Sequence, residues 1–434
     1  MKSPSTVQPA GQYHLVQEGD DYVFTWDGGA IEIRVSRIAD SRGDTNAEIK
    51  VSTTLPPSPG CLEWGRINLS AMTTRASLAK NLEARLPFDW QGALLQVAHK
   101  AVELRRQGEP TVDLTAVGQR QTRWLLWPFI EYGGPTVLFA DGGTGKSVLA
   151  LMMAYSVASA KPILGRPQGP PQNVLYLDWE TDAETHAERL RAIHNAYAFG
   201  TDCPVVHYKR MAGSLADSVE QIRQEVARLH IALVIVDSLS LAVGGGMALE
   251  ESATATNFFA AARLIDACML AISHVSKATV ANSASNGQKA SPFGSAFFRN
   301  TARLAWYVES LQEEGADESV VRFEHVKSNN GRYQKQRGYR LTFDNVGDEG
   351  NEQLAGIRIS QVELSDIPEF AQKLTWPQRI SAVLAHQRLT TADLAAELGE
   401  EDNTVVSRKL NKLQAQGRVV RLADSTWALA AREQ

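Results

Sequence analysis

The segment at residues 140–147, ADGGTGKS, constrains the fold of this 434-residue chain more than any other. It follows the apolar run PTVLFA and leads into KSVLALMMAYSVA, which is apolar on nearly every side. A glycine-rich turn between a strand and a helix points backbone N–H groups, and the positive end of the helix, at an anion. The phosphate-binding pattern G-x-x-x-x-G-K-[ST] has this arrangement. Gly145, Lys146 and Ser147 match it, whereas Ala140 stands where the pattern has glycine.

The residues of this loop predict a site for ATP and Mg²⁺. In such a site the glycine-rich backbone holds the phosphates, Lys146 reaches the β- and γ-phosphates, and Ser147 binds the metal ion. The alternative is a glycine-rich turn with an incidental Lys-Ser pair, and the matching strand and helix on its flanks argue against it. The predicted ATP-binding residues are Asp141, Gly142, Gly143, Thr144, Gly145, Lys146, Ser147 and Val148.

Beyond the loop, apolar runs continue to alternate with helical stretches. The runs are NVLYLDW at 173–179, IALVIVD at 231–237 and CMLAIS at 268–273. Continuous apolar strands with intervening helices predict a mostly parallel sheet that is buried on both faces. The length suggests about three domains. We expect an N-terminal module at 1–118, an α/β core at 119–366, and a linker with a C-terminal domain at 367–434.

Carboxylates stand at the ends of two of these runs. Asp237 ends ALVIVD as in a Walker B element, whose acid holds Mg²⁺ through water opposite Ser147. The alternative for Asp237 is a cap of the next turn. Glu180 follows LYLDW, and we expect it to polarise the attacking water as the general base. Asp178 and Asp182 are nearby competitors, and Glu180 could simply begin the acidic helix that follows.

The ordered set of motifs resembles the RecA-like P-loop ATPases of the plasmid RepA hexameric helicase type. ADGGTGKS, LYLDWETDAETHAERL and ALVIVDSLS carry the resemblance, and LAISHVSKA, GSAFFRNTAR and EHVKSNNG extend it over roughly half of the chain. It implies a RecA-like fold and a homo-oligomer, with a hexameric ring favoured. It also implies that His274 senses the γ-phosphate, with Lys277 as a weaker second sensor. A lone histidine after a strand can also serve packing alone.

One position departs from the family's pattern. RepA-type proteins carry an arginine directly before the Gly-Ser pair, where it acts as a finger into the next subunit's ATP; in this chain Phe293 stands there. Because such a finger stabilises transition-state charge, another cation must replace it or hydrolysis is slow. Arg299, Arg303 and Lys327 are the candidates. We expect Lys327 or Arg303 to substitute, and a surface salt bridge is the alternative role for either.

Two regions are predicted to contact DNA. By the resemblance, loops at 241–256 and 277–294 face single-stranded DNA, with Lys277 and Lys289 as their cations; plain surface loops are the alternative. From residue 377 the chain shows a helix, a short helix, a third helix and two short strands, which is the order of a winged helix. Such a domain can read double-stranded DNA or dock on protein. Its candidate DNA-binding residues are Arg408, Lys409, Lys412, Arg418 and Arg421.

The N-terminal region shows no chemical motif. Alternating runs between Tyr13 and Thr53 predict a small antiparallel sheet, and residues 70–108 have helical patterns. This β-rich α+β module is expected to serve partners or assembly.

Composition limits the ways in which the chain can bind its partners. The 44 Lys and Arg residues against 49 Asp and Glu give a net charge of −5, so nucleic-acid contact requires local patches. Three scattered cysteines favour a reducing, cytoplasmic compartment. No run of 18 apolar residues occurs, so we expect no membrane span.

Two functions from different classes fit these features. The first is an ATP-hydrolysing DNA motor or DNA-remodelling ATPase, like a replicative helicase or replication-initiation protein of a plasmid, phage or mobile element. The second is an ATP-switched DNA-binding regulator or loader that does not unwind DNA. Phe293 favours the second, whereas Glu180 and His274 favour the first. A recombinase filament is a third possibility.

Overall fold

The computed structural model describes ten stretches of the chain: residues 11–18, 21–41, 43–57, 59–107, 111–118, 123–197, 202–244, 252–275, 296–348 and 351–430. The chain divides into two compact units, the first ending at Gln121 and the second containing most of the remainder. Within the described residues, no helix combines the length and the apolar character that crossing a membrane requires.

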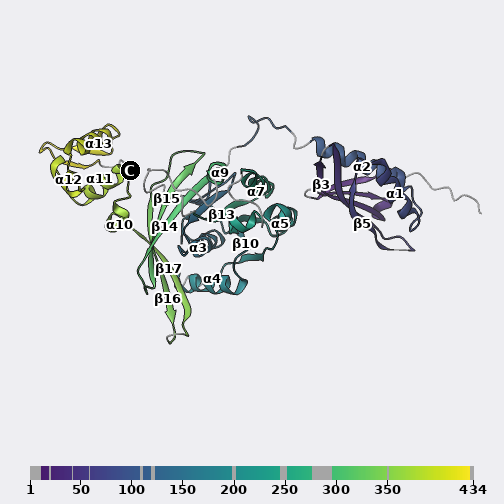
Figure 1. Ribbon diagram of the computed structural model, residues 1–434, viewed down its shortest axis with the longest axis horizontal. Coiled ribbons are helices and arrows are strands. Elements are labelled where there is room, and N and C mark those ends of the chain that lie inside the picture. Colours follow the sequence, from purple (N-terminus) through teal and green to yellow (C-terminus); the bar gives the residue numbers. More distant parts are fainter. Residues whose placement is uncertain are drawn as a thin grey trace, which may run out of the picture. The chain divides into compact units, whose positions relative to one another are not determined.

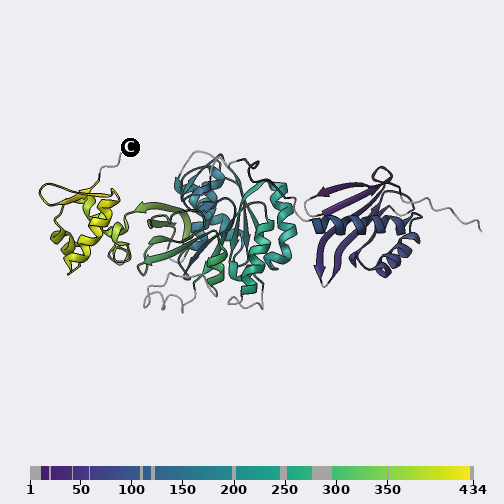
Figure 2. The ribbon, with the colours of Figure 1, turned by 90° about the horizontal axis from the view of Figure 1, so that it is seen from above.

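The first unit is a five-stranded antiparallel sheet with two helices on one face (Figure 2, purple and blue). Apolar side chains alternate along its strands, and those on one face pack against the helices around Trp26 and Trp90. The 3-10 turn η1 (Asp27–Gly29) joins the second and third strands. The elements are β1 (His14–Glu18), β2 (Asp21–Trp26), β3 (Ile31–Ser41), β4 (Asp44–Thr53), β5 (Gly60–Asn68), α1 (Met72–Glu83) and α2 (Trp90–Gln107).

The second unit is built on a nine-stranded sheet in the order β11-β10-β12-β13-β8-β14-β15-β16-β17 (Figure 1). The first six strands in this order run parallel, and each of the last three is antiparallel to its neighbour. The strands are β8 (Thr136–Ala140), β10 (Asn173–Asp178), β11 (Val206–Arg210), β12 (Ile231–Asp237), β13 (Cys268–His274), β14 (Leu304–Gln312), β15 (Glu318–Ser328), β16 (Arg337–Val346) and β17 (Gln353–Val362).

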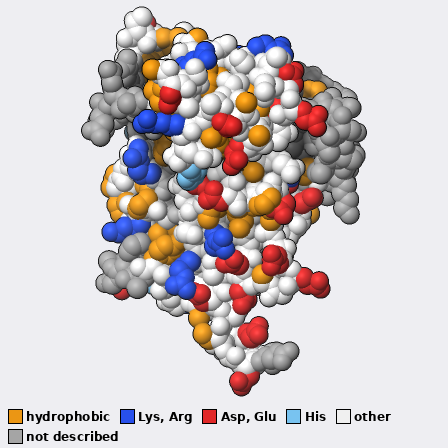
Figure 3. Space-filling model, turned by 90° about the vertical axis from the view of Figure 1, so that its left-hand side faces the viewer, with side chains coloured by type: hydrophobic (Ala, Val, Ile, Leu, Met, Phe, Trp, Pro, Cys, Tyr) orange, Lys and Arg blue, Asp and Glu red, His pale blue; other side chains and the backbone are white. Residues whose placement is uncertain are grey.

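The antiparallel strands qualify the expectation of a mostly parallel sheet. Connections of five to eight residues join β14 to β15, β15 to β16 and β16 to β17. A parallel pairing needs a crossover of a dozen or more residues, so these consecutive strands must pair as hairpins. The β16–β17 hairpin extends beyond the sheet, and acidic side chains gather near its end, toward the bottom of Figure 3.

The helices of this unit follow the parallel strands, and a small sheet covers one end of α3. The helices are α3 (Lys146–Ser159), α4 (Ala183–Tyr197), α5 (Leu215–Leu229), α6 (Leu239–Ala242), α7 (Ser252–Leu264) and α9 (Ala296–Thr301). The small sheet has the order β7-β6-β9, with β6 (Trp124–Trp127), β7 (Ile130–Glu131) and β9 (Arg166–Pro167).

Helix α3 is buried along almost its whole length. Lys146 and ten consecutive residues from Val148 to Val157 are buried, as expected for a helix that is apolar on nearly every side. The parallel strands cover one side of it. Tyr339, Leu341 and Ile357 of the antiparallel strands belong to the same hydrophobic cluster. The sheet therefore curves around this helix, and β17 comes to lie beside α4 (Figure 1).

The chain after β17 contains η2 (Leu364–Asp366), α10 (Pro368–Ala371), α11 (Trp376–His386), α12 (Thr391–Glu397), α13 (Asn403–Ala415), β18 (Val419–Arg421) and β19 (Trp427–Leu429). The segment expected as a linker forms the short helix α10. Phe370 of this helix is buried, with the Arg322 guanidinium 5.9 Å from its ring. Three helices and the β18–β19 ribbon then share a small core around Leu410 and Trp427.

Tyr197 closes the free edge of β17. Its hydroxyl accepts from the Ile359 N–H at 2.9 Å and donates to the Ile359 carbonyl at 3.2 Å. Both backbone groups of this edge residue are thus paired by one side chain.

We predict that Tyr197→Phe lowers the free energy of unfolding of this unit by about 1–3 kcal/mol, because it leaves a buried N–H without its acceptor. Urea unfolding measures the change, with Tyr333→Phe on an exposed tyrosine as the matched control. Equal stability of the two variants would contradict the role given to this hydroxyl.

Candidate functional site

The phosphate loop joins the end of β8 to the start of α3. Gly143 and Gly145 have φ angles of 77° and 78°, in the left-handed region that glycine adopts without strain. Ala140 is not among the residues with positive φ and lies inside the buried end of β8. Alanine is therefore accommodated where the sequence pattern has glycine.

Lys146 lies over this loop and is buried. Its Nζ donates to the Asp141 carbonyl at 2.7 Å and to the Ala140 carbonyl at 3.2 Å, and it lies 3.3 Å from Nδ1 of His274. Burial lowers the pKa of Lys146, and the carboxylates of Asp237, Glu180 and Asp141 oppose that shift. Phosphate oxygens would offer this ammonium charged acceptors, which form stronger hydrogen bonds than carbonyls do.

The register of the sheet gathers the other candidate groups at the same edge. Asp178 and Asp237 are opposite residues of the parallel pair β10 and β12. His274 of β13 is opposite Ala140, directly before the phosphate loop. Because parallel strands end at the same edge of a sheet, groups that are distant in sequence converge there.

Asp237 has the setting of a magnesium ligand. The Ser147 hydroxyl donates to its carboxylate, and the Tyr176 hydroxyl donates to its Oδ2 at 2.7 Å. Burial raises the pKa of Asp237; these two hydrogen bonds oppose the shift, and the charges of Glu180 and Asp178 add to it. The oxygens of Ser147 and Asp237 face one another, and hard oxygen donors are the ligands that Mg²⁺ prefers. The residues present therefore fit the ion.

The three acids proposed for water activation have different surroundings. Glu180 is partly exposed, with Oε1 3.9 Å from Nε2 of His274 and accepting from the Ser238 hydroxyl. Asp182 accepts from the N–H of Thr185 at 2.7 Å, which is a helix-capping contact at the start of α4. Asp178 is buried and saturated with hydrogen bonds. Of the three, Glu180 is the acid that lies beside the phosphate-loop lysine's partner, His274.

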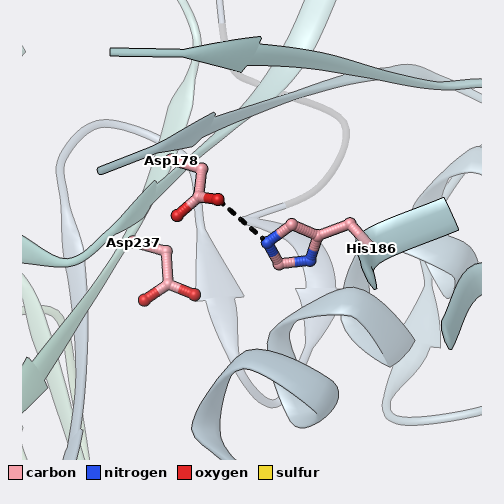
Figure 4. A group of neighbouring side chains, drawn as sticks. All are labelled: Asp178, His186 and Asp237. Atoms are coloured by element: carbon pink, nitrogen blue, oxygen red, sulfur yellow. Dashed lines mark hydrogen bonds and ion pairs between the residues drawn. The ribbon is translucent and has the colours of Figure 1, made fainter. Parts of the chain in front are cut away.

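Asp178, His186 and Asp237 form a buried group whose ligand atoms lie within 4.8 Å of one another (Figure 4). Asp178 accepts from the N–H groups of Glu180 and Thr181, from Nε2 of His186 at 3.2 Å and from the Tyr208 hydroxyl at 3.2 Å. A metal ion would have to displace these donors. We therefore interpret the group as the support of the turn that carries Glu180.

His186 donates to Asp178 as a neutral imidazole. Burial lowers the pKa of His186, and the carboxylates of Asp178 and Asp237 oppose the shift. The ring lies 4.5 Å from that of Tyr176, between the two carboxylate-bearing strands and α4.

The candidate finger cations lie at the opposite end of the strands. Arg303 precedes β14, whose first residue, Leu304, is opposite Thr136 at the start of β8. Lys327 donates to the Asn300 carbonyl, and burial together with the charges of Arg299 and Arg303 lowers the pKa of Lys327. The length of β8 separates this cluster from the phosphate loop by roughly 15 Å, at about 3.3 Å per residue. These cations do not reach the loop of their own chain.

The remaining predicted residues fall into two groups. Lys277, Lys289 and Phe293 lie outside the described residues. Five cations predicted to contact DNA are exposed on α13, the turn after it and β18, where the Arg421 guanidinium lies 5.9 Å from the Trp427 ring: they are Arg408, Lys409, Lys412, Arg418 and Arg421.

Sequence reasoning missed three residues of this site: Tyr176, His186 and Ser238. Ser238 directly follows Asp237, and that adjacency is the signal that could have found it. Tyr176 and His186 have no such signal, because their roles depend on how β10 and α4 pack.

Comparisons with known proteins agree with this geometry. Residues 100–280 match the family model of an AAA domain, a range that contains the phosphate loop and the strand ends described above. Together with the parallel strands, this match identifies a RecA-like P-loop ATPase core within the chain. None of the curated proteins compared with the chain matches it.

Three solved structures are similar to the chain. The flagellar accessory protein FlaH from Methanocaldococcus jannaschii is 13% identical over 53% of this chain and 91% of that chain, with a TM-score of 0.34. An ATPase domain, solved as a separate structure, is 15% identical over 51% of this chain and 84% of that chain, with a TM-score of 0.38. A KaiC-like protein from the hyperthermophilic archaeon Pyrococcus horikoshii OT3 is 13% identical over 54% and 93%, with a TM-score of 0.36.

We predict that His186→Leu lowers the free energy of unfolding by about 1–3 kcal/mol, because the buried Asp178 carboxylate loses a donor. His186→Gln is the matched control, since its amide can still donate, and it should lose less. Calorimetric Tm values of the two variants test this; a Leu variant as stable as the wild type would show that the bond does not support the turn.

Proposed function

We propose that the chain is an ATP-hydrolysing DNA motor or DNA-remodelling ATPase, of the kind that serves as a replicative helicase or replication-initiation protein of a plasmid, phage or mobile element. The observation that carries this proposal is the meeting of Lys146, His274 and Glu180 at one sheet edge, within 3.3 and 3.9 Å of one another in turn. A cation, a polar sensor and an acid in contact are what coupling of hydrolysis to movement requires. The AAA domain match supports the ATPase part.

Each of these residues has a separate role in the proposal. The N–H groups of residues 142–147 and the Lys146 ammonium bind and orient the phosphates. The Ser147 hydroxyl and the Asp237 carboxylate would hold Mg²⁺, which neutralises developing phosphate charge when it is bound. Glu180 orients and polarises the attacking water. His274 exchanges its contact with Lys146 for one with the γ-phosphate, and so reports occupancy to the strand that carries it.

Lys327 and Arg303 would act on another copy of the chain. Their place at the far end of the strands prevents them from serving their own phosphate loop, so a role in hydrolysis requires a neighbouring subunit. This supports a homo-oligomer, with a hexameric ring favoured. The alternative is that the two cations only stabilise the surface around α9.

Contacts with DNA are proposed at two places. Lys277 and Lys289 would face single-stranded DNA. The C-terminal helices and ribbon would act as a winged helix, with α13 in the major groove and Arg418 and Arg421 on phosphates. The protein would work in the cytoplasm.

A second function is favoured by one observation. Phe293 stands where the RepA-type pattern has its finger arginine. Without an effective finger the chain would be an ATP-switched DNA-binding regulator or loader, which binds ATP, assembles on DNA and does not unwind it.

We predict that single-stranded DNA stimulates ATP hydrolysis and that the protein displaces a strand from a forked duplex. Phosphate release with and without oligonucleotide, and a fluorescence unwinding assay, measure the two activities. ATP binding and DNA binding without stimulation or unwinding would reject the motor and support the regulator.

We predict that Lys146→Ala abolishes nucleotide binding, because the phosphates lose their ammonium partner, whereas Glu180→Gln binds ATP but slows turnover by about 100-fold or more. Fluorescent-ATP binding and single-turnover hydrolysis separate the two effects. Lys80→Ala, on an exposed helix of the first unit, is the control. Normal turnover by Glu180→Gln would transfer the general-base role to another group.

A further inference from the structure

Basic residues concentrate at the edge of the core opposite the phosphate loop, near α9 in Figure 1. The chain as a whole has more acidic than basic residues. In contrast, the four segments that meet at this edge, 123–136, 160–172, 299–305 and 327–338, contain nine Lys and Arg residues and one acid, Glu131. Glu131 is fully buried and paired with Arg123. The charge exposed by these segments is therefore positive throughout.

Hydrogen bonds join the segments into one surface. The Asn329 N–H donates to the Arg303 carbonyl at 3.1 Å, and the Asn330 side chain donates to Glu131 at 3.1 Å. Because Glu131 also holds Arg123, the cations around Arg303 and those around Arg123 are neighbours. We call the surface formed by the four segments the basic edge.

Aromatic rings alternate with the cations along the basic edge. The guanidinium groups of Arg337 and Arg166 lie 4.6 and 5.3 Å from the ring of Trp127. Arg123 lies 5.2 Å from the ring of Trp124. Tyr333 is 53% exposed and meets the buried ring of His325 at 5.5 Å, so its position is fixed while its ring remains accessible.

We propose that the basic edge binds single-stranded nucleic acid. Single strands are held by cations that follow the phosphates and by aromatic rings on which unpaired bases stack. Exposed Arg166, Arg332 and Lys335 would contact phosphates, and Tyr333 would stack on a base. A duplex offers no unpaired base to Tyr333. The inference adds a binding surface to the proposed function, since it uses neither Lys277 and Lys289 nor the C-terminal domain.

The first test measures salt dependence. The wild type and the triple variant Arg166→Ala/Arg332→Ala/Lys335→Ala bind a fluorescent 20-nucleotide oligo-dT, followed by anisotropy from 50 to 300 mM NaCl. Each lost contact to a single strand removes about 0.7 from the slope of log K against log salt, so the triple variant should lose about 2. The control, Lys209→Ala/Arg228→Ala/Arg358→Ala, removes the same charge from cations that are ion-paired elsewhere, and its slope should not change.

The second test isolates the ring. Tyr333→Ala should weaken oligo-dT binding about tenfold, and Tyr333→Phe should bind like the wild type, because stacking needs the ring and not the hydroxyl. Equal affinities of the Ala and Phe variants would overturn the stacking role.

Three outcomes separate the possible failures. An unchanged slope in the triple variant, with wild-type binding intact, overturns this inference and leaves the proposed function standing. If sedimentation shows that the triple variant changes its oligomeric state while its slope stays the same, the basic edge is a contact between copies and the inference fails. A wild-type protein that binds no oligo-dT overturns both.

Discussion

The arrangement of the core depends on burying α3 on every side. This helix begins at the phosphate loop, and its apolar residues require cover that a flat sheet on one side cannot supply. The antiparallel strands β15–β17 curve around it, and the small sheet and α4 contribute to its remaining sides. Dense packing of this kind fixes the start of the helix, and with it the N–H groups that face a phosphate. The rigidity of the site therefore comes from the hydrophobic core behind it.

The second constraint is strand register. Asp178 and Asp237 are opposite one another because β10 and β12 pair in parallel with matched ends, and His274 reaches the loop through its pairing with Ala140. Hydrogen bonds then hold the turn after Asp178 in place. Three segments separated by dozens of residues thus supply one site, and their spacing depends on backbone pairing more than on any single side chain.

Part of this organisation could be predicted from sequence, and part could not. The strand ending in Asp237 and the loop before α3 were predictable because their apolar runs are continuous and their ends are marked by glycine or acid. Strand β11 has no such run, since Val206–Arg210 is half-exposed at the sheet edge and contains two basic residues. The pairing direction of β15–β17 depends on connection lengths, and the buried bond between His186 and Asp178 depends on packing, so neither has a signal in the local sequence.

The far edge and the phosphate-loop edge of the core carry opposite charge. Carboxylates stand at the strand ends near the loop and along the β16–β17 hairpin, and arginines and lysines stand at the other end. The core is therefore an electric dipole aligned with its parallel strands. A polyanion approaching from solution is drawn to one end of it and repelled by the other, before any contact forms. Two copies that meet head to tail attract each other, whereas like ends repel, so the field favours the directional contacts that close rings or extend filaments over symmetric pairing.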